Sequence, residues 1–194
     1  LPERFALDGE PLVTVTFSYM TGIEWLAGRG YNTLGVSFPA RFAGERDRVA
    51  GDFLAVLWEN LADPIITGRE ELGFSKIYCE LPEPRVHGGE THCTASWLGF
   101  KFLDLRVWNL ERRPPPAEGA APRGLLHFKY LPRTGEWGAA DVAYATFTPG
   151  EGRHKAIDET WEGQGAIEFY AAAWEDLPTM FHIVNALRDL EGPA

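Results

Sequence analysis

The sequence predicts a mainly β fold, an antiparallel barrel or sandwich with a few packed helices, in a single domain over residues 1–194. Three observations predict it. Apolar and polar residues alternate in many short segments, turn-forming residues separate these segments, and hydrophobic residues make up 45% of the chain. A chain of this length can bury one full core. Residues 111–123, with three consecutive prolines, are expected to form a flexible surface loop.

The expected strands follow one another from the start of the chain. Residues 12–19 set the pattern, because Val13, Val15 and Phe17 alternate with threonine and serine. The same pattern, bounded by Gly, Pro, Asp or Asn, predicts strands at residues 31–42, 52–58, 76–81, 91–97, 100–110, 124–130, 142–148 and 165–171. Many short strands with turn signals favour a barrel or a sandwich.

Two segments predict helices instead. Asp63-Pro64 supplies an N-cap and a first-turn proline, and this helix should end at Gly73. Asp176 and Pro178 should open a second helix near the end of the chain, where apolar residues recur at helical spacing. Both helices are expected to pack on the sheet.

The charge of the chain argues against nucleic acid as a partner. Eighteen Lys and Arg against 28 Asp and Glu give a formal charge of -10, which repels phosphate. Apolar runs are far shorter than the roughly 20 residues of a membrane-spanning helix, and no secretory signal is visible, so no membrane partner and a cytoplasmic location are expected. Cys79 and Cys93 are expected to be reduced, ordinary small hydrophobic residues.

The aromatic content predicts assembly into a homo-oligomer. A small barrel should not need to bury so much aromatic bulk by itself. The tryptophans behind this prediction are Trp58, Trp97, Trp108, Trp137 and Trp174.

Metal and nucleophilic-serine motifs are missing from the sequence. His87 and His92 lie close to Cys79 and Cys93, but without the paired short spacings of zinc ligands. No Gly-x-Ser-x-Gly elbow and no glycine-rich phosphate loop occur. We therefore expect no metal and no cofactor.

Lys76 is the candidate that carries chemistry. It follows the first expected helix and begins an expected strand, between Phe74 and the apolar pair Ile77-Tyr78. A lysine that points inward at this place loses hydration, which favours the neutral amine over the ammonium form. A neutral amine can attack a ketone. Taken alone, a lysine at the end of a strand is more often solvated at the surface.

The residues around Lys76 resemble the acetoacetate decarboxylase superfamily. Its hallmark is a Gly-Arg-Glu stretch followed by an aromatic-Pro-Lys run, and Gly68-Arg69-Glu70 and Phe74-Ser75-Lys76 fill these positions. Residues 1–13 resemble the opening strand of that family, and residues 161–183 resemble its closing strand and helix. The resemblance implies an acetoacetate decarboxylase-like β-barrel with helices outside, and Lys76 as a lysine that forms a Schiff base without a cofactor.

The sequence departs from that family at several positions. Thr33 falls where the resemblance implies an essential acidic residue, and Thr16 falls where it implies a second glutamate. Ser75 replaces the family proline, and Ile77 replaces a second lysine. We expect Thr33, Thr16 and Phe74 to bind the substrate beside the site lysine.

The resulting hypothesis is a Schiff-base lyase that acts on a small keto acid or a related carbonyl compound. Its iminium would serve decarboxylation, aldol cleavage or dehydration, because in each case a positive nitrogen withdraws electrons from the neighbouring carbon. Threonine does not titrate near neutral pH, so Thr33 and Thr16 cannot replace acidic groups in proton transfer. The alternative is a catalytically inactive barrel that binds a small apolar or carbonyl ligand.

Overall fold

The computed structural model describes residues 1–10, 12–115, 123–150 and 157–190, and these are mostly strands, as the sequence predicts. Two short helices and two single turns accompany the strands. The elements in chain order are β1 (Phe5–Leu7), β2 (Thr14–Ile23), η1 (Glu24–Leu26), β3 (Arg29–Ala43), β4 (Arg48–Glu59), α1 (Ala62–Thr67), η2 (Gly68–Leu72), β5 (Lys76–Tyr78), β6 (Arg85–His87), β7 (Glu90–Trp97), β8 (Phe100–Arg113), β9 (Leu125–Pro132), β10 (Ala140–Thr148), β11 (Thr160–Phe169) and α2 (Phe181–Arg188).

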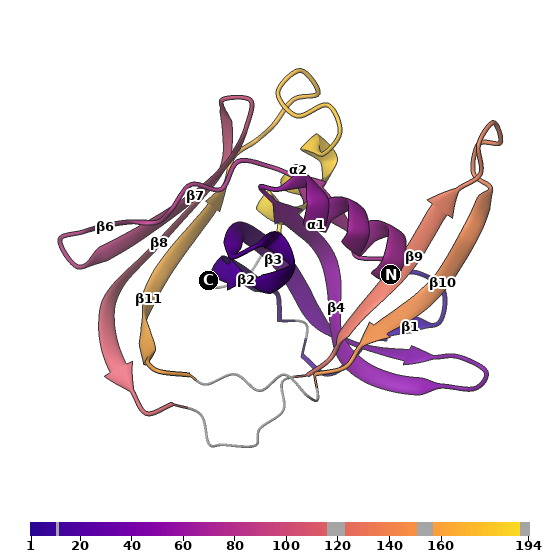
Figure 1. Ribbon diagram of the computed structural model, residues 1–194, viewed down its shortest axis with the longest axis horizontal. Helices are drawn as coiled ribbons and strands as arrows, with labels where there is room; N and C mark the ends of the chain where they lie inside the picture. Colours follow the sequence, from indigo (N-terminus) through magenta and orange to yellow (C-terminus); the bar gives the residue numbers. More distant parts are fainter. Residues whose placement is uncertain (11, 116–122, 151–156, 191–194) are drawn as a thin grey trace. The chain divides into compact units, whose positions relative to one another are not determined.

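The first sheet has the strand order β1-β3-β4-β9-β10, with β2 also paired to β3 and β5 to β4. Most pairs are antiparallel, and Figure 1 shows β9 and β10 as one long hairpin. The exceptions lie at β4, which pairs in parallel with both β5 and β9. A parallel neighbour needs a crossover connection, and the α1–η2 segment supplies it between β4 and β5. The sheet is therefore mixed rather than purely antiparallel.

The second sheet is antiparallel throughout, in the order β11-β8-β7-β6. Strands β11, β8 and β7 lie side by side over most of their length (Figure 1). In the part of the chain that the structure describes, neither sheet is closed on itself.

The chain divides into two compact units, and each is described here by itself. Unit 1 comprises residues 1–18, 33–78 and 118–155, and unit 2 comprises residues 19–32, 79–117 and 156–194. The prediction of one domain over residues 1–194 stays a prediction.

Unit 1 has an aromatic core. Phe5, Ala40 and Leu126 are buried at its centre, and the Phe5 ring lies 5.0 Å from that of Phe42 and 5.2 Å from that of Phe53. Phenylalanine pairs at such separations add to the stabilisation from apolar burial. This core fixes β1, β3 and β4 against one another, and β4 carries the site described below.

Unit 2 buries Phe102 and Leu103 of β8, and it packs α2 against β11. Val184 is the buried residue of α2, and the Asn185 side chain donates to and accepts from the backbone of Ala172. This helix starts later than the sequence predicts, because Asp176 caps a preceding turn by accepting from the Ala173 amide.

The first helix also differs from its prediction in detail. Asp63 lies in the first turn of α1 rather than at the N-cap, which is Leu61. Gly73 ends the helical segment as predicted, with φ of 80°, a conformation that glycine adopts without strain. The expected loop at residues 111–123 begins later, since β8 continues to Arg113. Residues 116–122 of that loop lie outside the described residues.

Candidate functional site

Lys76 is placed by a short return of the chain from η2 to β5. After the turn at Gly73, the Phe74 amide donates to the carbonyl of Gly68 at 3.1 Å, and the Leu57 amide of β4 donates to Ser75 at 2.9 Å. Lys76 then pairs in register with Leu57 as the first residue of β5. The start of this strand is therefore fixed on both sides, by the helical turn and by β4.

The Lys76 side chain is buried, with a residue exposure of 8%. Its Nζ donates to the carbonyl oxygen of Pro64 at 2.9 Å and lies 2.9 Å from Oε1 of Glu59. The Phe74 ring lies 5.1 Å from the same nitrogen, within the range of a cation–π contact. Burial of the amine agrees with the sequence prediction, but its surroundings are not mostly apolar, because a carboxylate and a carbonyl contact it.

Gly68 makes room for the amine. A Cβ at this position would lie 2.6 Å from both Cε and Nζ of Lys76. The backbone of Gly68 is ordinary right-handed helix, with φ of -66° and ψ of -36°, so only the approach of the lysine requires glycine here. Arg69 donates from Nη1 to the backbone carbonyl of Lys76 at 2.9 Å and thereby holds the strand start. This contact gives Arg69 a structural role.

Glu59, the last residue of β4, is 1% exposed. Its Oε1 contacts the Lys76 amine, whereas no hydrogen-bond partner reaches its buried Oε2 among the described residues. Burial raises the pKa of Glu59, and the hydrogen bond and charge of Lys76 oppose this only in part. The site thus holds a buried amine and a buried carboxyl group in direct contact.

The other predicted site residues lie at different distances from this pair. Thr33 of β3 is buried and is the direct cross-strand partner of Glu59. Phe74 is half-buried and lies close to both the lysine and His127, whose ring centroid is 3.9 Å from that of Phe74. Thr16 is exposed on β2, so the structure does not bring it into this buried group. Its assignment to substrate binding stays a prediction.

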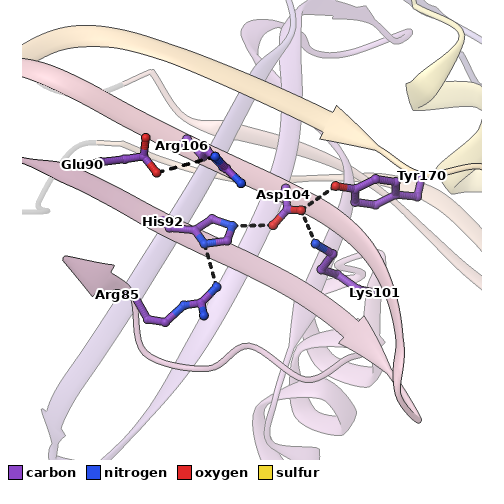
Figure 2. A network of polar contacts seen from close by, with 7 residues as sticks. All are labelled: Arg85, Glu90, His92, Lys101, Asp104, Arg106 and Tyr170. Carbon is purple, nitrogen blue, oxygen red and sulfur yellow. Dashed lines mark hydrogen bonds and ion pairs between the residues drawn. The ribbon is translucent and has the colours of Figure 1, made fainter. Parts of the chain in front are cut away.

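A second cluster of polar side chains lies on the β7–β8 face of unit 2 (Figure 2). Asp104 accepts hydrogen bonds from Lys101 and from Tyr170, the latter at 2.5 Å, and its other oxygen lies 2.5 Å from His92 Nε2. Burial acts to raise the pKa of Asp104, but these hydrogen bonds outweigh it and lower the pKa to about 2. The Asp104 carboxylate is thus held ionised by three donors that join β7, β8 and the segment after β11, which is a structural arrangement.

The described residues contain no group of three His, Cys, Asp or Glu side chains placed to hold a metal ion. Cys79 and Cys93 are both buried free cysteines, as the sequence predicts. Within the described ranges, no helix combines the length and apolar character needed to cross a membrane.

These observations first define a class: a mainly β protein with a lysine amine buried against a carboxyl group. The chain matches the acetoacetate decarboxylase family over residues 1–189, and it belongs to this family. No curated protein sequence matches the chain.

Solved structures show the same fold. The chain is similar to an acetoacetate decarboxylase structure with a TM-score of 0.71 at 20% identity, over 91% of this chain and 68% of that one. Its similarity to acetoacetate decarboxylase from Legionella pneumophila has a TM-score of 0.69 at 21% identity and covers 89% of this chain. The chain spans 65% of the length of that protein.

A third similar structure is that of the enduracididine biosynthesis enzyme MppR. The TM-score is 0.64 at 16% identity, over 92% of this chain and 71% of that one. That enzyme was solved in complex with the condensation product of pyruvate and imidazole 4-carboxaldehyde.

Sequence reasoning found the lysine but missed Glu59. Alternation ends the expected strand at Trp58, and a charged residue after an apolar run is normally the solvated end of a strand. In the structure Trp58 and Glu59 are both buried, although neighbours in a strand point to opposite faces. The strand end is therefore covered on both faces, and no local signal in the sequence indicates this.

Proposed function

We propose that Lys76 forms a Schiff base with a small keto acid and that the protein is a cofactor-independent carbon–carbon lyase. The observation that carries this proposal is the burial of the Lys76 amine next to a proton-accepting group, in a chain that belongs to the acetoacetate decarboxylase family. Amines in such surroundings serve as nucleophiles toward carbonyl carbon.

In the proposed reaction the neutral amine adds to the carbonyl carbon, the resulting hydroxyl group takes up a proton and leaves as water, and a C=N bond forms with a positive nitrogen. When the substrate bears a carboxylate on the adjacent carbon, the C–C bond to it breaks and its electrons move to the iminium nitrogen, which releases carbon dioxide. The enamine takes up a proton at carbon, and water then returns the amine and the ketone product. Aldol cleavage and dehydration use the same iminium.

The experiment is reductive trapping of the full chain with acetoacetate and with pyruvate. Sodium cyanoborohydride reduces an iminium to a stable secondary amine, which intact mass detects and peptide mapping assigns to a lysine. We expect a single adduct on Lys76, no adduct in Lys76→Met, and an unchanged adduct in Lys129→Met. The absence of an adduct across both keto acids would favour the inactive ligand-binding alternative.

A keto acid as substrate class, a homo-oligomeric assembly and a cytoplasmic location belong to the same proposal. The pyruvate-derived ligand in the MppR structure supports the first of these, and pyruvate is therefore included as a probe.

A further inference from the structure

Glu59 has contacts that an anchoring role leaves unexplained. The Lys76 amine already donates to the Pro64 carbonyl at 2.9 Å, so Oε1 of Glu59 is a second acceptor for the same nitrogen. The other carboxylate oxygen, Oε2, is buried with no hydrogen-bond partner among the described residues. A buried carboxylate oxygen without a donor is costly, and such groups point to a function when they persist.

The direct contact between the two groups allows a proton to pass between them. In water the ammonium and carboxylate forms are strongly favoured, but burial disfavours the charged form of the Glu59 carboxyl group. The neutral amine and the neutral carboxylic acid lie one proton transfer away across the 2.9 Å separation. The same burial that raises the pKa of Glu59 makes this carboxyl group a better proton acceptor.

We propose that Glu59 is the acid–base group of the Lys76 site, taking the proton from the lysine ammonium and returning it to the departing hydroxyl of the substrate. This inference rests on the proposed function, because it requires a Schiff base on Lys76. Glu59 contacts the reacting nitrogen itself, so its role is catalytic rather than positioning.

The proton balance of the step is closed. Transfer from the ammonium to Glu59 gives a neutral amine and a carboxylic acid. The amine nitrogen bonds to the carbonyl carbon, and a proton shift from nitrogen to oxygen gives the carbinolamine. Glu59 then donates its proton to the hydroxyl group, the C–O bond breaks, water leaves, and the C=N bond forms. The result is an iminium and a water in place of an ammonium and a ketone, with Glu59 again ionised.

Other charged or titratable groups near this pair come from two further elements. Arg69 of η2 donates to the backbone carbonyl of Lys76, and His127 of β9 stacks on Phe74. Thr33 of β3 lies opposite Glu59 but does not titrate. A pH dependence of the site must therefore be assigned by variants of both Glu59 and His127.

The test measures the rate of adduct formation between pyruvate and the full chain, trapped with cyanoborohydride, between pH 4.5 and 8. In the unmodified protein the rate should fall toward acid as Glu59 becomes protonated and stops accepting the proton. Glu59→Gln keeps the size of the side chain but cannot carry a proton. Its rate should therefore be lower by at least about 10²-fold, and it should lose this fall of the rate toward acid, the acid limb. His127→Gln should keep the limb, and the exposed Glu70→Gln should behave as the unmodified protein.

Chemical rescue supplies a readout that a structural role would not change. Formate added to Glu59→Ala should restore part of the rate, since a small carboxylate can occupy the vacated volume and carry the proton. An adduct that forms in Glu59→Gln at the unmodified rate over the whole pH range would overturn the inference while leaving the Lys76 Schiff base in place. Failure of the unmodified protein to form any adduct would instead remove the proposed function. If the Glu59 variants do not fold, two results still overturn the inference. The first is a rate in the unmodified protein that does not fall toward acid. The second is a fall toward acid that disappears in His127→Gln.

Discussion

Thr33 of β3 and Glu59 of β4 are direct partners across two antiparallel strands, and both are buried. Partners of this kind point to the same face of a sheet, with Cβ atoms about 4.5–5.5 Å apart. The acidic side chain that the family resemblance implies at position 33 is thus replaced by threonine, while a carboxylate stands on the neighbouring strand. This carboxylate contacts the amine of Lys76.

The first prediction concerns a second acidic group at position 33. Thr33→Glu should destabilise the protein at pH 7 by about 1–3 kcal/mol relative to Thr33→Gln, because a buried carboxylate would stand opposite Glu59 without a cation of its own. The difference should shrink toward pH 5, where one of the two carboxyl groups can be protonated. Urea unfolding of both variants at several pH values measures this. Equal stability at pH 7 would contradict it.

The second prediction concerns the stability of the buried pair. Lys76→Met leaves Glu59 buried without its cation, and we expect a loss of about 3–5 kcal/mol at neutral pH. The double variant Lys76→Met/Glu59→Leu should recover most of this loss. Chemical denaturation in a double-mutant cycle gives the coupling between the two positions. Additive losses from the two changes would show that the pair does not interact.

The same cycle has a predicted pH dependence. Burial raises the pKa of Glu59 above its usual 4.5, so the folded state binds this proton more tightly than the unfolded state. The stabilisation that comes from this tighter proton binding by Glu59 is therefore fully present below pH 4.5. It is lost as the pH rises through the pKa of Glu59 in the folded state. Without the lysine charge this effect should grow, so Lys76→Met should be least destabilising in acid.

The third prediction tests the space that Gly68 leaves for the amine. Alanine suits the helical backbone of this residue and by itself should stabilise it by up to about 1 kcal/mol. However, its Cβ would displace Cε and Nζ of Lys76. Gly68→Ala should therefore lower the rate of adduct formation by at least about tenfold, a modest displacement of a reacting atom being enough for this. Ile66→Ala, an exposed position in α1 just before Gly68, is the matched control and should keep the rate.

The fourth prediction concerns acid stability in unit 2. The pKa of Asp104 is held at about 2, below its usual 3.8, by Lys101, Tyr170 and His92. The stabilisation is present above pH 3.8 and is lost as the pH falls toward 2, and it amounts to about 2 kcal/mol. Asp104→Asn should remove it, so that the two proteins differ at pH 6 and converge near pH 2. Urea unfolding across this range provides the measurement.

The fifth prediction is the homo-oligomer. Of the tryptophans behind it, Trp58 is fully buried within its own unit, whereas Trp137 and Trp174 are exposed. Exposed large aromatic side chains are enriched at interfaces between chains. Sedimentation velocity at micromolar concentration should show a species larger than the 21.6 kDa monomer. A single monomeric species would reject the prediction.

Periodicity in the sequence predicts most strands, because a period of two depends only on neighbours along the chain. It does not predict that β4 has parallel partners, because β5 returns through the α1–η2 crossover and β9 comes from much later in the chain. Lys76 could be found because its flanking residues form a recognisable pattern. Glu59 and His127 could not, since their burial depends on strands and turns that approach from elsewhere in the chain.

The groups around the Lys76 amine have a kinetic consequence, because they come from one continuous stretch. This stretch runs from residue 59 to the lysine itself and contains Glu59, Pro64, Gly68 and Phe74. Closing so short a loop costs little chain entropy compared with pairing β8 and β11, whose partners Asp104 and Glu168 are far apart in sequence. The amine and its carboxyl partner can therefore meet early in folding, before the long-range strand pairs of the other sheet have formed.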